Sequence, residues 1–225
     1  MNETPSASRT AWLVVMRLIP VALLNYLDRQ MLATMKSSML GDLPDIQTKA
    51  QWGLVLGSFK WVYAIFSPIG GYLADRISRR HVICFSLFAW SAVTWATGQV
   101  NNYEQLLWTR AIMGVSEAFY IPAALALIAD YHLGPTRSRA IGLHQMGIYI
   151  GVIIGGFAGY AADEPTIGWR GAFFCVVPLA AVTLAWLFDF PGSRPVLRWT
   201  GAACLGAAIL LMVALVPPSG YRLAV

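Results

Sequence analysis

Seven apolar stretches of about 20 residues each dominate this chain and limit the folds that it can adopt. A helix of about 20 apolar residues is long enough to cross the hydrocarbon core of a bilayer. The stretches run approximately over residues 11–35, 52–74, 82–100, 103–129, 140–162, 171–190 and 196–216. Their apolar character is continuous, whereas a transmembrane barrel needs strands of about ten residues that alternate between apolar and polar positions. We therefore predict an all-α membrane protein.

The composition agrees with this prediction and excludes several functions. Charged residues make up 12% of the chain, against about 25% in soluble domains. The net charge of +5 indicates basic loops on the cytoplasmic side and not nucleic-acid binding. Cys84, Cys175 and Cys204 all lie in apolar stretches and show neither metal-ligand spacing nor a disulfide framework. We expect no metal, no cofactor and no enzymatic activity, because no catalytic or phosphate-binding pattern is present.

Basic loops alternate with mixed or acidic ones along the chain. Arginines follow the second, fourth and sixth apolar stretches, at Arg76, Arg79, Arg80, Arg137, Arg139, Arg194 and Arg198. The intervening loops hold Asp42, Asp45, Glu104, Asp163 and Glu164. Because positively charged loops stay on the cytoplasmic side, we predict a cytoplasmic N-terminus in a multi-pass protein of a cell membrane, the bacterial inner membrane in the first instance. Residues 1–10 then form a cytoplasmic tail, 11–190 a six-helix unit, and 191–225 a linker, a seventh apolar segment and a short tail.

An acid and a base lie side by side inside the first apolar stretch, in LNYLDRQML at residues 24–32. Asn25, Asp28 and Arg29 are spaced i, i+3 and i+4, so they share one helix face. Ionisable side chains at membrane depth are costly and mark substrate or ion pathways. A carboxylate between an apolar surrounding and a cation can exchange protons near neutral pH, and a guanidinium matches an anionic carboxylate. We predict proton exchange at Asp28 and anion binding at Arg29.

Further polar side chains lie inside other apolar stretches. Arg110 and Glu117 are seven residues apart and also share a face, so two readings remain open: functional groups, or internal ion pairs Asp28–Arg29 and Arg110–Glu117 that hold the helices. Lys60 is expected to add positive charge to a central cavity, with Tyr63 beside it, or else to extend to the outer interface. Other candidates for the cavity wall are Tyr26, Tyr120, His144 and Gln145, although ordinary packing or contact between helices is the first interpretation of each.

Glycines recur every fourth residue in the fifth apolar stretch. They occupy positions Gly147, Gly151, Gly155 and Gly159. This spacing places them on one helix face, where small residues allow close approach of a neighbouring helix. We predict a structural role for them.

The loop after the second apolar stretch carries a recognisable motif, GGYLADRISRR at residues 70–80. Its Gly71, Asp75, Arg76, Arg79 and Arg80 resemble the loop signature of the major facilitator superfamily, with Ser78 where that family usually has glycine. Further matches are Arg110 with Gly114, GIYIGVIIGG at 147–156 and GWRGAFF at 168–174, so the resemblance covers about residues 12–190. It implies the N-terminal six-helix half of a transporter with two halves, in which the loop motif and Arg110 control conformation and the substrate binds between the halves.

Two subgroups of the superfamily share the motif around Asp28. The sequence NYLDR, together with GVSEAFYIPA at residues 114–123, resembles the anion:cation symporters, which carry sugar acids and related organic anions. Spinster-type lipid transporters have a similar Asn-Tyr-x-Asp-Arg. The first resemblance implies that Asp28 and Glu117 bind protons and that Arg29 holds the substrate carboxylate.

We therefore expect proton-coupled symport of a sugar acid or another organic anion by alternating access. The alternatives are a spinster-type lipid transporter and a membrane scaffold derived from a transporter half. The expected partners are membrane lipid, the anionic substrate, protons and a second six-helix half, supplied by the same gene or by a dimer. A fragment of a longer gene is the favoured explanation of the missing half, and a dimerising half-transporter or a non-transporting remnant are the others.

Overall fold

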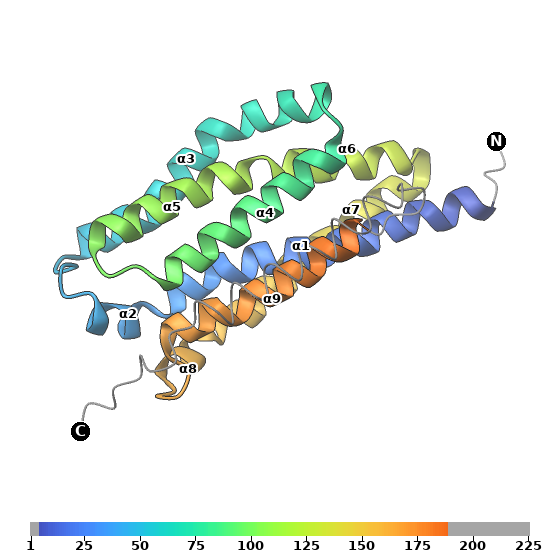
Figure 1. The fold of residues 1–225 in the computed structure, drawn as a ribbon. Helices are drawn as coiled ribbons and strands as arrows, with labels where there is room; N and C mark the ends of the chain where they lie inside the picture. Colours follow the sequence, from blue (N-terminus) through green and yellow to red (C-terminus); the bar gives the residue numbers. More distant parts are fainter. Residues whose placement is uncertain (1–4, 189–225) are drawn as a thin grey trace.

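The computed structural model describes residues 5–188, which form an all-helical bundle (Figure 1). The helices are α1 (Pro5–Thr34), α2 (Lys36–Asp42), α3 (Lys49–Arg76), α4 (Arg79–Gly98), α5 (Tyr103–Ala118), α6 (Tyr120–Tyr131), the 3-10 turn η1 (Gly134–Thr136), α7 (Arg137–Gly156), α8 (Ala158–Asp163) and α9 (Gly168–Phe188). The predicted all-α class is confirmed. The seventh apolar segment, residues 196–216, lies outside the described residues, as do Arg194, Arg198 and Cys204.

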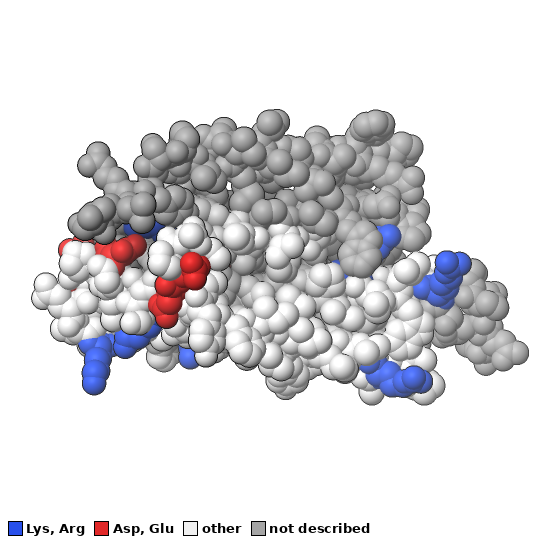
Figure 2. All heavy atoms as spheres, turned by 90° about the horizontal axis from the view of Figure 1, so that it is seen from below, with Lys and Arg blue, Asp and Glu red and all other residues white. Residues whose placement is uncertain are grey.

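Five stretches of the described chain are long and apolar enough to cross a membrane. They are Arg9–Thr34, Lys49–Arg76, Arg79–Gly98, Tyr103–Tyr131 and Gly134–Asp163. These correspond to the first five stretches predicted from the sequence, and α9 corresponds to the sixth. On the face shown in Figure 2, acidic side chains gather at the end that carries α2 and α8, basic side chains lie at both ends, and an uncharged band separates them. Such a band is the surface that a bilayer requires.

Side-chain caps define where two of the long helices begin. Thr48 accepts a hydrogen bond from the backbone N–H of Gln51, and the Gln51 side chain accepts one from the N–H of Thr48, which makes a capping box at the start of α3. Asn102 accepts from the N–H of Gln105 at the start of α5, at 2.9 Å. Both caps satisfy N–H groups that a helix leaves without partners.

The fourth apolar stretch differs from the single helix expected between residues 103 and 129. It contains two helices, α5 and α6, which are separated at Phe119. Pro122 explains the break, because proline has no N–H to donate to the carbonyl of Ala118 four residues earlier. The fifth stretch is likewise divided, into α7 and α8, at Phe157.

The glycine stripe of α7 packs directly on α1, as the sequence predicted. A Cβ atom built on Gly147 would lie 2.9 Å from the carbonyl oxygen of Ile19, and one on Gly155 would lie 2.5 Å from that of Leu27. A Cβ on Gly151 would collide with the Leu23 carbonyl. The two backbones can approach this closely only because these positions of α7 carry no side chain.

Replacing Gly151 by valine is therefore expected to destabilise the bundle by about 1–3 kcal/mol, because the added carbons force α1 and α7 apart. Thermal unfolding of the detergent-solubilised chain measures the effect. Gly142→Val is the matched control, since a Cβ at Gly142 meets nothing within 4 Å. Equal loss of stability in both variants would contradict the packing described here.

Candidate functional site

The charged side chains of α1 and α5 meet as two crossed ion pairs. Arg29 contacts the Oε2 atom of Glu117 at 2.5 Å through both Nε and Nη2. Arg110 lies 3.3 Å from the Oδ2 atom of Asp28. Each acid therefore pairs with the arginine of the other helix, and not within its own helix as in the ion pairs considered from the sequence. The crossed pairs hold α1 and α5 together at membrane depth.

The two pairs differ in how deeply they are buried. The side chains of Asp28 and Glu117 are fully buried, and that of Arg110 is 2% exposed. The Arg29 side chain is 21% exposed. An incoming anion can therefore reach Arg29 more readily than Arg110, so Arg29–Glu117 is the better candidate for a substrate site.

Three aromatic rings surround the guanidinium of Arg29. Its carbon Cζ lies 4.5 Å from the ring centre of Tyr26, 4.6 Å from that of Phe59 and 4.9 Å from that of Tyr63. Tyr26 precedes Arg29 by one helical turn on α1, while Phe59 and Tyr63 are one turn apart on α3 and stack on each other. Such rings attract a cation through their faces. Phe59 was not among the predicted site residues, although its four-residue spacing from Tyr63 is visible in the sequence.

Two threonines of α4 complete the polar surroundings of Arg110 and Asp28. Arg110 donates from Nη2 to Oγ1 of Thr97 at 2.7 Å, and Thr94 donates to Oδ1 of Asp28 at 3.4 Å. The sequence analysis missed both, because a threonine in an apolar helix carries no signal of its own. With these bonds, Arg110 joins α1, α4 and α5, an arrangement that favours a structural role for Arg110, in which it holds these helices together, over contact with a substrate.

The remaining predicted cavity residues occupy different environments. Asn25 is buried beside the ion pairs on α1, whereas Lys60 of α3 and Gln145 of α7 are exposed. Tyr120 and His144 are both buried, and the hydroxyl oxygen of Tyr120 lies 3.0 Å from Nε2 of His144. Contact of these side chains with a substrate stays a prediction.

The basic loop motif connects the α3–α4 turn to the end of α6. Arg79 pairs with Asp75 at 3.6 Å, forms an ion pair with Asp130, and donates to the carbonyl of Ala126 at 2.9 Å. Asp130 is a partner that the sequence analysis missed. Of the other motif residues, Gly71 lies against Pro122, and Arg76 lies over the ring of Tyr72. The motif thus links the α3–α4 turn to α6, a geometry suited to control of conformation.

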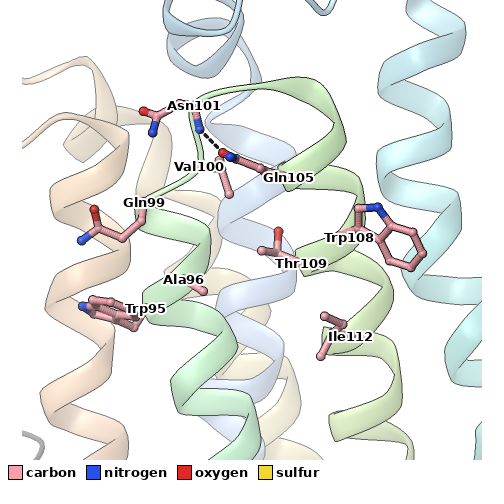
Figure 3. Close-up of a pocket in the computed structure, with 9 residues that line it drawn as sticks. All are labelled: Trp95, Ala96, Gln99, Val100, Asn101, Gln105, Trp108, Thr109 and Ile112. Carbon is pink, nitrogen blue, oxygen red and sulfur yellow. Dashed lines mark hydrogen bonds between the residues drawn. The ribbon is translucent and has the colours of Figure 1, made fainter.

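A surface groove of about 420 Å³ lies apart from the ion pairs, between the ends of α4 and α5 (Figure 3). Its rim includes Gln105, whose side chain accepts a hydrogen bond from the backbone N–H of Asn101 at 2.8 Å. Trp95 and Trp108 lie on its walls, at the helix ends where tryptophan is common in membrane proteins. Neither charged pair contributes to this lining. Among residues 5–188, no group of three or more His, Cys, Asp or Glu side chains is arranged to hold a metal.

Comparison with known proteins identifies the family. The sequence model of the Major Facilitator Superfamily matches residues 18–202. The chain belongs to the major facilitator superfamily. Its crossed pairs therefore lie in a transporter fold.

Several relatives within the superfamily are spinster proteins. Human protein spinster homolog 1 is 33% identical over 190 residues, which cover 81% of this chain and 34% of that protein. The probable galactarate/D-glucarate transporter GudP of Bacillus subtilis is 29% identical over 202 residues, or 83% of this chain and 42% of that protein. The chain thus spans about a third of the length of human spinster homolog 1.

A solved structure supports the same assignment. The crystal structure of a bacterial homolog of the human lysosomal transporter spinster, inward-facing and unoccupied, matches with a TM-score of 0.65 and 26% identity. The match covers 98% of this chain and 45% of that one. These relatives favour the spinster alternative over the sugar-acid group that the sequence analysis put first.

Proposed function

We propose that this chain is the first half of a spinster-like secondary transporter, in which an anionic amphipathic substrate replaces Glu117 as the partner of Arg29. The observation that carries the proposal is the pairing of the partly exposed Arg29 with the buried Glu117 among three aromatic rings. Glu117 binds a proton when the substrate takes its cation, because an unpaired carboxylate at membrane depth is costly in its charged form. Transport is then coupled to protons.

The surroundings of Arg29 favour a lipid-like substrate. A guanidinium binds a phosphate or carboxylate through a planar set of donors, while the rings of Tyr26, Phe59 and Tyr63 offer apolar surface to a hydrocarbon chain. The likeness to spinster proteins over most of the chain supports the same substrate class, since the spinster-type transporters that the motif around Asp28 resembles carry lipids. A sugar acid is the second candidate, and it is favoured by the likeness to the GudP transporter.

The other predicted groups have supporting roles in this scheme. Asp28 is a second proton site, which exchanges its proton when Arg110 moves away from it. Lys60 contributes positive charge to the path of the anion. The loop residues around Asp75 and Arg79 hold one conformation and release it during alternating access. The second six-helix half, from a longer gene product or from a second copy, supplies the opposite wall of the substrate site, and the N-terminus lies in the cytoplasm of a bacterial cell.

Arg29→Gln is expected to weaken binding of dansyl-labelled lysophosphatidylglycerol by about tenfold to a hundredfold, because a charge-assisted hydrogen bond is lost. Energy transfer from the tryptophans of the detergent-solubilised chain to the dansyl group measures the affinity. Arg9→Gln is the matched control, since Arg9 is an exposed arginine of the same helix.

Competition with D-glucarate separates the two candidate substrates. Displacement of the lysolipid only by other anionic lysolipids supports the lipid assignment. Strong binding of glucarate with no measurable lysolipid binding would favour the sugar-acid assignment. Unchanged lysolipid affinity in Arg29→Gln would overturn the role of Arg29.

A further inference from the structure

The break between α5 and α6, at Phe119, lies two residues after Glu117. Because Pro122 has no N–H, the carbonyl of Ala118 lacks its helical donor. This carbonyl faces α3, where a Cβ on Gly70 would lie 2.7 Å from it. On the α4 side, Ser86 donates to the carbonyl of Ser116 at 2.6 Å. The chain that carries Glu117 is therefore interrupted, and contacts from neighbouring helices fix its direction.

A further contact is made by a buried tyrosine that joins three helices. The hydroxyl of Tyr120, the first residue of α6, lies 3.0 Å from the carbonyl oxygen of Leu18 on α1 and 3.0 Å from Nε2 of His144 on α7. Tyr120 is 1% exposed and His144 is fully buried. Gly147, one turn after His144, packs on the same segment of α1. The tyrosine oxygen is thus held between two helices that are themselves tightly packed.

Hydrogen-bond bookkeeping assigns the proton positions at this oxygen. A carbonyl can only accept, so the hydroxyl proton of Tyr120 is donated to Leu18. The oxygen then has only acceptor capacity left, and His144 must donate to it from Nε2. Nδ1 of His144 has no hydrogen-bond partner, which fits a neutral ring with its single proton on Nε2. His144 therefore acts here as a directed donor.

We propose that His144 is a positioning residue for the proton-carrying Glu117, acting through Tyr120. Tyr120 follows Glu117 by three residues, so any rotation or shift at the start of α6 moves the carboxylate. The Arg29–Glu117 contact of 2.5 Å tolerates little displacement, since hydrogen bonds weaken steeply with distance and angle. The inference rests on the proposed function, because it assumes that exchange at Glu117 matters, but its readout does not require transport.

The readout is the titration of the Glu117 carboxyl, followed by infrared spectroscopy of the chain in lipid nanodiscs and assigned by its loss in Glu117→Gln. The ionisable groups that interact with Glu117 are Arg29 and Asp28 from α1, Arg110 from α5 and Tyr63 from α3, and Tyr26 lies against the guanidinium of Arg29. Among them, Arg29 is in direct contact with Glu117. Arg29→Gln therefore gives the reference shift of the midpoint of the Glu117 titration, on the order of one to three pH units upward.

Two variants of His144 form a matched pair. The side-chain amide of glutamine can place an N–H where Nε2 stands, whereas that of asparagine reaches only the position of Nδ1. His144→Gln is expected to keep the wild-type midpoint, and His144→Asn to move it upward by about one pH unit, part of the effect of losing Arg29. A purely structural role of the hydrogen bond would lower the unfolding temperature of His144→Asn and leave the midpoint of the Glu117 titration unchanged.

Tyr120→Phe removes the shared hydroxyl and serves as the second test, also in case His144→Asn does not fold. The same upward shift is expected in it. A wild-type midpoint in folded His144→Asn or in Tyr120→Phe, while Arg29→Gln shifts it, would overturn the positioning role and leave the proposed function intact. If Arg29→Gln itself leaves the midpoint unchanged, the proposed function fails first and the positioning role fails with it.

Discussion

Replacing Arg110 by methionine is expected to destabilise the bundle by about 3–5 kcal/mol, because it leaves the carboxylate of Asp28 buried without its cation. Arg110 lies 3.3 Å from Asp28, and both side chains are buried. The same change removes the bond to Thr97 that joins α5 to α4. Thermal and denaturant unfolding of the detergent-solubilised chain measure the loss.

Two further variants show whether the effect comes from the pair. The double variant Arg110→Met with Asp28→Asn is expected to regain most of the lost stability, since the isolated charge is gone. Arg139→Met, at an exposed position of α7, is expected to stay within about 0.5 kcal/mol of the wild type. If Arg110→Met unfolds like the wild type, Arg110 does not hold these helices together.

Glu117→Gln is expected to strengthen anion binding at mildly alkaline pH by about tenfold to a hundredfold. In the wild type, an ionised Glu117 holds Arg29, and a substrate anion must displace it. Glutamine is neutral and competes weakly, and the affinity difference corresponds to roughly 1.4–2.8 kcal/mol. Binding of dansyl-labelled lysophosphatidylglycerol to the wild-type chain should tighten as pH falls, because protonation neutralises the competing carboxylate.

In Glu117→Gln this pH dependence should be absent over the same range. Asp28→Asn is the matched control, because it neutralises the other buried acid, which pairs with Arg110 and not with Arg29. It should keep the wild-type pH dependence of anion binding. A pH dependence that disappears in Asp28→Asn and persists in Glu117→Gln would show that Asp28, and not Glu117, couples anion binding to protons.

Features that depend on one helix were predictable from the sequence. The length of the apolar stretches predicted the spans, and the four-residue repeat from Gly147 to Gly159 predicted a close helix contact, which the structure places on α1. Asp28 and Glu117 stood out because ionisable side chains are costly at membrane depth. Each of these features depends on the spacing of residues along one helix or on the cost of placing one side chain in the membrane.

Features that depend on which helices pack together were not predictable in this way. Spacing along one helix suggested ion pairs within α1 and within α5, whereas the structure pairs Asp28 with Arg110 and Glu117 with Arg29. Asp130 is a partner of Arg79 only because the fold brings the end of α6 to the α3–α4 turn. The effect of Pro122 on helix continuity was open, since neighbouring helices often compensate for proline in membranes.

The choice between the sugar-acid and the spinster-type subgroups depends on more residues than the shared motif. The motif around Asn25, Asp28 and Arg29 occurs in both sugar-acid and spinster-type transporters, so these residues alone do not separate them. The chemistry of this site also depends on side chains from other helices, and Phe59 of α3 adds apolar surface beside Arg29. Likeness over most of the chain favours the spinster proteins.

In the proposed coupling, a proton takes the place of Arg29 at Glu117 when an anion binds. Counting the protons taken up on anion binding tests it most directly, with lysophosphatidylglycerol added to the weakly buffered, detergent-solubilised chain and a pH-indicator dye. At mildly alkaline pH we expect an uptake that approaches one proton per bound anion in the wild type and no uptake in Glu117→Gln. Anion binding without proton uptake in the wild type, or equal uptake in both proteins, would contradict it.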